Sequence, residues 1–338
     1  MQFSQPPLRI CVLGGTGFVG SELVARLAAA GHWVRVPTRS LERGKHLAVL
    51  PTVELLAVNV HEPRVLGELL AGIDVAINLV GILNESSGAR FRDVHVELVA
   101  KLIEEARIAR VRRLLHMSAL GADAERAPSQ YLRTKGRAEM LVAGAAQFLE
   151  YTIFRPSVIF GPGDSLTRRF AELLRLAGGW LPLARAGARF APIAVDDVAS
   201  AFLRALRDRA TIGQTYELCG PDTLSLEELV RVTAHGAQLP CHIVRVPDLL
   251  ARLQGLLLGL VPGKPFSLDN FRSLTVDSLC RDDGCRRLGI EPQRLVALLP
   301  TYLGDLSPEV RLTRLRALAD ERARDRAKEA ARARLASR

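Results

Sequence analysis

The sequence predicts an α/β fold, with a doubly wound parallel sheet and a smaller, partly helical C-terminal lobe. In the first half of the chain, short apolar or β-branched runs alternate with longer segments of helical periodicity, as expected for successive βαβ units. A glycine-rich turn joins the first such run to the first helical segment. After about residue 165 the alternation becomes irregular and turn-rich, which marks a second lobe.

The order of elements follows from the strand and helix signals. Buried strands are expected at residues 8–13, 32–39, 53–58, 74–81, 112–118 and 151–161, and helices at 21–31, 94–107 and 131–145. A strand and a helix follow at 191–206 and again at 215–230, where Thr223 or Ser225 is expected to cap the helix. The predicted division is a sheet domain over 1–165 and 191–219, a substrate or partner lobe over 166–190 and 220–305, and a basic helical tail over 306–338.

Charge is concentrated at the C-terminal end. The net charge is +10, and residues 306–338 hold ten Arg or Lys against five Asp or Glu, which is half of the excess. Aromatic residues make up 5% of the chain and do not alternate with the basic ones, which argues against a nucleic-acid partner. Leu312, Leu315 and Leu318 recur at helical spacing, so the tail is expected to be either a solvated helix or one that contacts an anionic membrane.

Several classes of protein are disfavoured by simple patterns. Residues 1–10 show no secretory signal, so a cytoplasmic location is expected, with a peripheral position at the inner face of a membrane as the alternative. The apolar stretch 253–261 is far shorter than the ~20 residues of a membrane-spanning helix. The five cysteines, Cys11, Cys219, Cys241, Cys280 and Cys285, lack zinc spacing. They are expected to be reduced thiols, and no metal site is predicted.

The glycine turn VLGGTGFVG at 12–20 predicts a dinucleotide site in a Rossmann-type domain. Gly14, Gly17 and Gly20 follow a strand and open a helix. The first allows a tight turn, the second lets the backbone approach a pyrophosphate, and the third lets strand and helix pack closely. The phosphates would meet free N–H groups at the helix N-terminus. A purely structural glycine turn is the alternative.

The end of the second strand bears on the choice of nicotinamide cofactor. An acidic residue about 20 residues past the glycines would bind the ribose 2′-hydroxyl and repel a 2′-phosphate. This chain has Arg39 there, with Arg43 nearby and no acidic residue before Glu42. The sequence therefore favours NADP, with NADPH preferred over NADH. A solvated basic loop is the alternative.

Tyr131 and Lys135, in YLRTK, lie one helical turn apart on one face. A protonated lysine beside the phenol would lower the tyrosine pKa from ~10 toward working pH. General acid–base chemistry on an alcohol or carbonyl requires such a shift. Because this spacing also occurs in helices with no catalytic role, the pair alone leaves both interpretations open.

The motifs together resemble the extended or atypical branch of the short-chain dehydrogenase/reductase superfamily. They are GGTGFVG at 14–20, NLVG at 78–81, YLRTK at 131–135, RPSVIFGPGD at 155–164 and PIAVDDVA at 192–199. The resemblance spans about residues 1–230. The pairing of HMSALGAD at 116–123 with SQYLRTKGRAE at 129–139 is most similar to the nucleotide-binding accessory subunit of respiratory complex I and its bacterial relatives.

The resemblance implies cofactor contacts for individual residues. The phosphate turn would be Gly14, Gly15, Thr16, Gly17, Phe18, Val19 and Gly20. Asn59 and Val60 would lie near the adenine, Leu79, Val80 and Gly81 near the ribose, and Pro156, Ser157 and Val158 near the nicotinamide, with Lys135 on its ribose. Asp196 and Asp197 would cap a helix rather than form a catalytic pair.

The catalytic residues implied by the resemblance are Tyr131, Lys135 and Ser118. Active relatives use a Ser or Thr at the end of the fifth strand, but the working hydroxyl often aligns with Ala119, whose methyl group cannot stabilise an oxyanion. Two functions therefore stay open. One is an NADP-dependent oxidoreductase acting on a hydrophobic carbonyl or quinone-related substrate, for which the leucine-rich segment 246–266 supplies apolar surface. The other is a non-catalytic accessory protein that holds its cofactor in an assembly like respiratory complex I.

Overall fold

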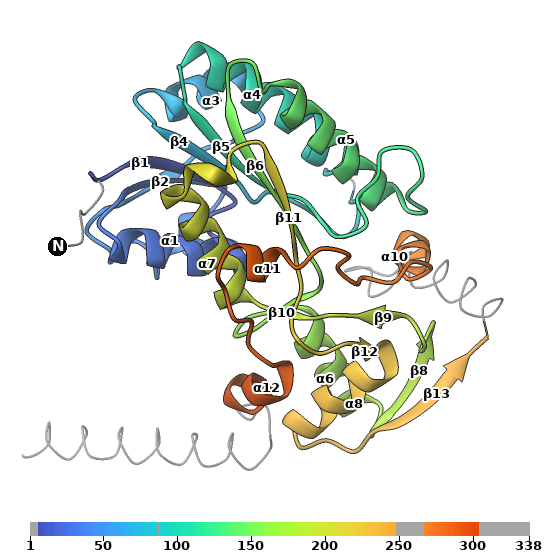
Figure 1. Cartoon of the computed structure of the whole chain (residues 1–338). Coiled ribbons are helices and arrows are strands. Elements are labelled where there is room, and N and C mark those ends of the chain that lie inside the picture. Colours follow the sequence, from blue (N-terminus) through green and yellow to red (C-terminus); the bar gives the residue numbers. More distant parts are fainter. Residues whose placement is uncertain (1–5, 87, 248–266, 304–338) are drawn as a thin grey trace, which may run out of the picture.

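A seven-stranded parallel sheet forms the centre of the molecule, in the order β11-β6-β5-β4-β1-β2-β3 (Figure 1). The computed structural model describes residues 6–86, 88–247 and 267–303. The strands of the sheet are β1 (Arg9–Leu13), β2 (Trp33–Thr38), β3 (Val53–Ala57), β4 (Val75–Asn78), β5 (Arg113–Met117), β6 (Glu150–Pro156) and β11 (Gln214–Leu218). The predicted parallel sheet is confirmed, and all the carboxyl ends of its strands lie along one edge.

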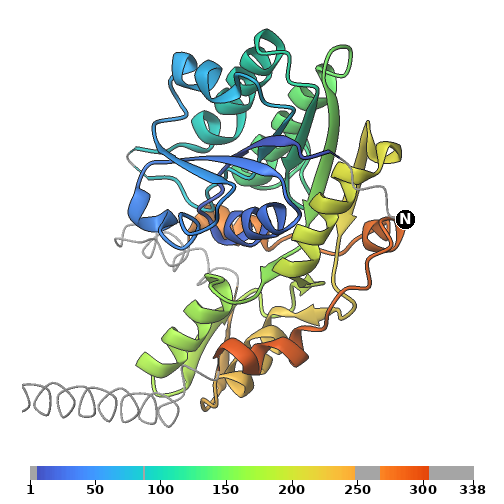
Figure 2. The ribbon, with the colours of Figure 1, turned by 90° about the vertical axis from the view of Figure 1, so that its left-hand side faces the viewer.

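Helices cover both faces of this sheet (Figures 1 and 2). One face is covered by α1 (Phe18–Ala29) and α7 (Val195–Arg207), and the other by α3 (Pro63–Leu70), α4 (Leu98–Ile108) and α5 (Gln130–Gly144). A π-helical turn, η1 (Arg92–Glu97), leads into α4. Successive side chains of β1 alternate between the two cores, because strand residues point to opposite faces in turn. The doubly wound architecture is therefore confirmed.

A third apolar core lies beyond the sheet and appears below it in Figure 2. Its elements are α6 (Leu166–Leu176), β8 (Trp180–Ala184), β9 (Arg189–Phe190), β12 (Leu224–Ser225), α8 (Leu226–Gly236), β13 (His242–Val246) and α12 (Leu295–Leu303). The short elements of the described chain are α2 (Leu41–Gly44), β7 (Ile159–Phe160), β10 (Ile193–Ala194), η2 (Arg209–Thr211), α10 (Leu268–Ser273) and α11 (Gly284–Arg287). Ser225 caps α8 in a capping box with Glu228, as predicted. The proposed domain boundaries remain a prediction.

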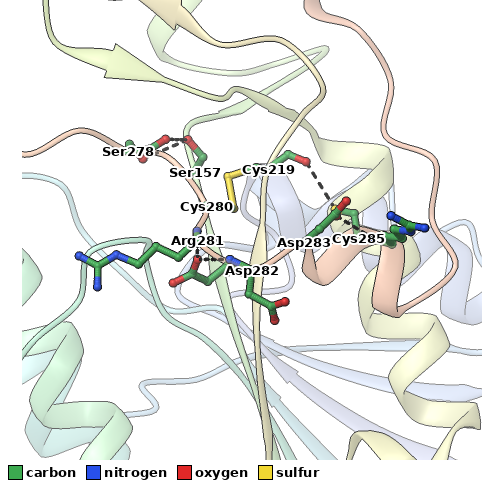
Figure 3. Close-up of a disulfide and its surroundings, with 10 residues drawn as sticks. Ser157, Cys219, Ser278, Cys280, Arg281, Asp282, Asp283 and Cys285 are labelled. Atoms are coloured by element: carbon green, nitrogen blue, oxygen red, sulfur yellow. Dashed lines mark hydrogen bonds between the residues drawn. A yellow bond between two sulfur atoms is a disulfide. The ribbon is translucent and has the colours of Figure 1, made fainter.

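Two predictions are corrected by long-range contacts. Cys219 and Cys280 form a disulfide across 61 residues of sequence, so the prediction of five reduced thiols is wrong for this pair (Figure 3). The reason is that the chain returns beside the end of β11 between α10 and α11. Asp196 and Asp197 do not cap α7, whose N-cap is Ala194. Asp196 instead pairs with Arg26 at 3.2 Å, and Asp197 accepts a hydrogen bond from the Gln293 N–H at 2.8 Å.

Two predicted surfaces fall outside the part of the chain that the structure describes. The basic tail, 306–338, and most of the leucine-rich segment, 248–266, lie outside the described residues. Among the residues that are described, none belongs to a helix both long and apolar enough to cross a bilayer.

Candidate functional site

The glycine turn sits at the carboxyl end of β1, where α1 begins. Gly14 has a φ of +81°, which favours glycine, and its carbonyl accepts the N–H of Gly17 at 3.0 Å. A Cβ at Gly20 would overlap the Gly14 carbonyl oxygen and lie 2.6 Å from Gly15 Cα. Helix α1 starts after Gly17 without a side-chain cap, so its first N–H groups face the turn. This geometry fits a phosphate at the start of α1.

Two other segments complete the walls around this turn. A Cβ at Gly14 would lie 3.1 Å from the backbone of Leu79 and Val80, so the segment after β4 closes one side. On another side, the turn that follows β7 lies against Phe18. A Cβ built at Gly161 in that turn would lie 3.7 Å from the Phe18 ring. The structure therefore gathers the glycine turn, residues 79–81 and the 156–163 segment at the carboxyl edge of the sheet, where dinucleotides bind in such folds.

The ends of β2 and β3 form the part of the site predicted to hold the adenosine. The Thr38 hydroxyl lies 3.3 Å from that of Thr16 in the glycine turn, and Arg39 follows it with an exposed side chain. Asn59 Oδ1 accepts the N–H of His61 at 3.2 Å, so this side chain forms a tight turn. Burial, then the charges of Lys101 and Arg39, lowers the pKa of His61. Arg39 thus places positive charge beside the ends of both strands.

Lys135 is buried at the same edge. Its Nζ donates to the Met117 carbonyl at 3.1 Å, and a Cβ at Gly81 would lie 3.1 Å from that nitrogen. The ammonium therefore sits between the end of β5 and the segment after β4, close enough to Gly81 that a side chain there would press on it. Burial lowers the Lys135 pKa to about 8, opposed by the charge of Glu139.

Tyr131 lies one turn earlier on α5, in apolar surroundings. Its ring contacts those of Phe91 and His95, with centroid distances of 6.0 and 5.6 Å, and it packs in a small cluster with Ala119. Burial raises the pKa of Tyr131 to about 12. The prediction that Lys135 lowers this pKa is therefore wrong for this structure, because desolvation of the phenolate dominates while the ammonium is bonded to Met117.

The third candidate, Ser118, is buried directly after β5. Its N–H donates to the Phe154 carbonyl at 2.7 Å, but its hydroxyl has no hydrogen-bond partner among the described residues. Buried polar atoms are nearly always paired, so an unpaired hydroxyl beside a candidate site is available for a ligand. Its neighbour Ala119 belongs, with Ala127 and Leu132, to the apolar cluster against which Tyr131 packs.

The residues predicted to face the nicotinamide are held by backbone and side-chain contacts. The Pro156 carbonyl accepts the Leu120 N–H at 3.0 Å, and the Val158 carbonyl accepts the Ile193 N–H at 2.9 Å. The Ser157 hydroxyl donates to the Ser278 carbonyl at 2.9 Å. Their contact with a nicotinamide ring stays a prediction.

His95 is a site residue that the sequence did not reveal. Its Nε2 accepts the Ile82 N–H at 3.1 Å, so Nδ1 carries the proton and donates to the Thr134 hydroxyl at 2.9 Å. The ring thereby joins η1, the segment after β4 and helix α5, next to Tyr131. Spacing gave no signal, because the three contacts come from separate parts of the chain.

Acid is expected to destabilise the protein through His95 and His116. Burial lowers their pKa values to about 2 and about 3, with the Lys135 charge adding to both shifts. The unfolded chain, with ordinary values of ~6.5, then binds more protons than the folded chain below that pH. Stability should fall by about 3 kcal/mol in total between neutral pH and about pH 5.5.

Urea denaturation at the two pH values measures this loss. His116→Gln should reduce the pH dependence, while His46→Gln, at an exposed ring, should leave it unchanged. An equal pH dependence of stability in wild type and both variants would contradict the assignment of a neutral, buried ring to His116.

Comparison with known proteins agrees with this geometry. The model of the NAD dependent epimerase/dehydratase family matches residues 10–219. The chain is 31% identical over 302 residues to the mitochondrial NADH dehydrogenase (ubiquinone) 1 alpha subcomplex subunit 9 of Arabidopsis thaliana, covering 84% of this chain and 74% of that protein. It is 29% identical over 239 residues to a ceramide reductase of Caulobacter vibrioides, covering 71% and 74%.

Solved structures show the same fold. The epimerase Mth375 of Methanothermobacter thermautotrophicus matches with a TM-score of 0.72 at 18% identity, covering 91% of this chain and 94% of that one. The family match runs from β1 to the end of β11, and so includes the glycine turn, Tyr131 and Lys135. Family membership supports the predicted binding of a nicotinamide dinucleotide. The chain belongs to the NAD dependent epimerase/dehydratase family, within the extended short-chain dehydrogenases/reductases.

Proposed function

We propose that this protein is an NADPH-dependent reductase of a hydrophobic carbonyl or quinone-related substrate. The observation that carries the proposal is the buried Lys135 ammonium beside Gly81, with Tyr131 one helical turn away, at the sheet edge that holds the glycine turn. The similarity to a ceramide reductase and to a 3-diazoavenalumate denitrifying reductase supports a reductive activity.

The proposed roles follow from the state of each side chain. A bound nicotinamide supplies the hydride. Lys135, which already donates to Met117, binds the ribose hydroxyls with its remaining N–H groups. Tyr131, whose pKa is raised to about 12, is a neutral phenol and therefore donates a proton to a carbonyl oxygen. His95 and Phe91 hold the tyrosine ring in place.

The direct test mixes nucleotide-free protein with NADPH and a panel of hydrophobic ketones and quinones. Loss of the near-ultraviolet absorbance of NADPH reports turnover. We expect turnover, and we expect Tyr131→Phe to lower its rate by about 10²- to 10⁴-fold. Absence of turnover with every substrate, together with a nucleotide that stays bound through purification, would support the second function below instead.

Preference for NADPH over NADH is expected to depend on Arg39. Its exposed guanidinium follows β2, where a 2′-phosphate would lie. Arg39→Ala should weaken NADPH binding about tenfold and leave NADH binding nearly unchanged, since one charge-assisted contact is lost. Fluorescence titration with both cofactors measures this. Arg168→Ala, at an exposed arginine of α6, is the control; tighter binding of NADH by the wild type would contradict the assignment.

A second function, that of a cofactor-holding accessory protein, is favoured by one observation. Ala119, at the position where active relatives often have the working hydroxyl, belongs to the apolar cluster against which Tyr131 packs. The similarity to subunits named for NADH dehydrogenase (ubiquinone) supports this alternative. Such a protein should release its nucleotide slowly. Mass spectrometry of the released nucleotide and its rate of exchange distinguish it from a reductase, which must exchange cofactor in every cycle.

A further inference from the structure

The disulfide between Cys219 and Cys280 is not used by the proposed chemistry, yet it lies close to the site (Figure 3). Cys219 directly follows Leu218, the last residue of β11, which pairs in register with Pro156 of β6. Cys280 lies in the segment from Ser267 to Asp283, here called the strap, which includes α10. The disulfide therefore fixes the strap beside residues predicted to contact the nicotinamide.

One part of the strap is bonded to the segments around Ser157. The Ser157 hydroxyl donates to the Ser278 carbonyl at 2.9 Å and lies 3.0 Å from its hydroxyl (Figure 3). The Ser278 N–H donates to the Arg189 carbonyl at 2.8 Å, and its carbonyl also accepts the Ala191 N–H at 3.1 Å. This part of the strap thus lies across the carboxyl end of β6.

The other part of the strap is bonded to the helix that carries Tyr131. The Asp269 carboxylate accepts the N–H groups of Gln130 at 2.8 Å and Tyr131 at 3.1 Å, at the positive end of α5. The Ser267 hydroxyl donates to the side chain of Asn84 at 2.9 Å. Asp269 and Ser267 therefore connect α5 to the segment after β4, so the strap bridges two walls of the site.

The residues that directly follow Cys280 are bonded to β11 by contacts that are exposed to water. The Arg281 and Asp282 N–H groups donate to Glu217 Oε2 at 2.6 and 3.3 Å, and these bonds are exposed. Exposed hydrogen bonds exchange readily with water. Within the described residues the disulfide is the one covalent cross-link between strap and sheet, and both of its cysteines are half-buried rather than enclosed in the core.

We propose that the Cys219–Cys280 disulfide is a redox lock on the site. A dithiol reductant transfers two electrons and two protons: its thiols become a disulfide, while Cys219 and Cys280 become thiols. The strap then separates from β11, Asp269 leaves the start of α5, and the nicotinamide end of the site opens. The oxidised protein holds its nucleotide and the reduced protein exchanges it. The regulatory role rests on the proposed function, because it requires a dinucleotide at this site.

The lock itself is tested without any nucleotide, by hydrogen exchange of full-length protein before and after reduction with dithiothreitol. Peptides that contain Gln130, Tyr131 and Arg281 should exchange about tenfold faster or more after reduction. The double variant Cys219→Ser/Cys280→Ser should show the fast rate under both conditions. Cys241→Ser, which removes a half-buried free thiol, should behave as wild type. Equal exchange in the oxidised and reduced wild type would overturn the lock.

The regulatory role is tested by the rate of NADPH release. An excess of non-fluorescent oxidised NADP displaces the bound NADPH, and the change in NADPH fluorescence gives the rate. Release should be about tenfold faster in the reduced protein and in the double variant. If the strap loosens while release is unchanged, the regulatory proposal is overturned. If neither form binds NADPH, the proposed function fails, and hydrogen exchange alone then decides whether the strap is locked.

Discussion

Tyr131→Phe is expected to lower the rate of carbonyl reduction by about 10²- to 10⁴-fold, the usual contribution of a positioned general acid, while leaving NADPH affinity almost unchanged. Lys135→Ala is expected to weaken NADPH binding about 10- to 100-fold, because it removes charge-assisted hydrogen bonds to the ribose. The difference follows from the proposed roles, in which the phenol donates to the substrate while the Lys135 ammonium, buried beside Gly81, binds the ribose.

Steady-state kinetics and NADPH titration on the two variants separate these effects. Arg137→Ala, at an exposed cation two residues further along the same helix, is the matched control and should match wild type in both. Equal loss of NADPH affinity in Tyr131→Phe and Lys135→Ala would mean that the pair stabilises α5 and serves no separate roles in the site.

Gly20→Ala is expected to destabilise the protein by about 3 kcal/mol or more and to abolish NADPH binding. The added methyl group would overlap the Gly14 carbonyl oxygen and lie 2.6 Å from Gly15 Cα. Because these are backbone atoms of the phosphate turn, no side chain can move to make room. The turn itself would have to shift away from α1. The N–H groups at the start of α1 would then no longer meet the phosphates of the cofactor.

The control for this variant is Gly144→Ala, near the end of α5. No atom lies within 4 Å of a Cβ built there, so the better helix propensity of alanine should stabilise the protein by up to about 1 kcal/mol. Thermal denaturation of both variants, with NADPH titration of the folded fraction, provides the measurement. A Gly20→Ala protein as stable as wild type would contradict the described packing of α1 on β1.

Local patterns predicted the sheet because its strands and helices have their own periodicity. The run from Ile10 to Leu13 is apolar on every residue, as a strand buried on both faces requires, and all four side chains are buried. The glycine turn also predicted its own geometry, since a φ of +81° at Gly14 and the close approach at Gly20 both demand glycine.

Contacts between distant segments left no such signal. The Asp269 carboxylate meets Tyr131 across 138 residues, and Cys219 meets Cys280 across 61, so neither spacing has a periodic pattern. The raised pKa of Tyr131 also left no signal in the sequence. The sequence showed the lysine one turn away but did not show the rings of Phe91 and His95 that desolvate the phenol.

The most direct test of the account is equilibrium titration of nucleotide-free, full-length protein with NADPH and NADH, followed by cofactor fluorescence, for wild type and Lys135→Ala. The account predicts saturable binding of one NADPH per chain, tighter than NADH, and weakened about 10- to 100-fold by Lys135→Ala. Absence of binding, or equal affinity in wild type and Lys135→Ala, would contradict a nicotinamide dinucleotide held at the carboxyl edge of this sheet.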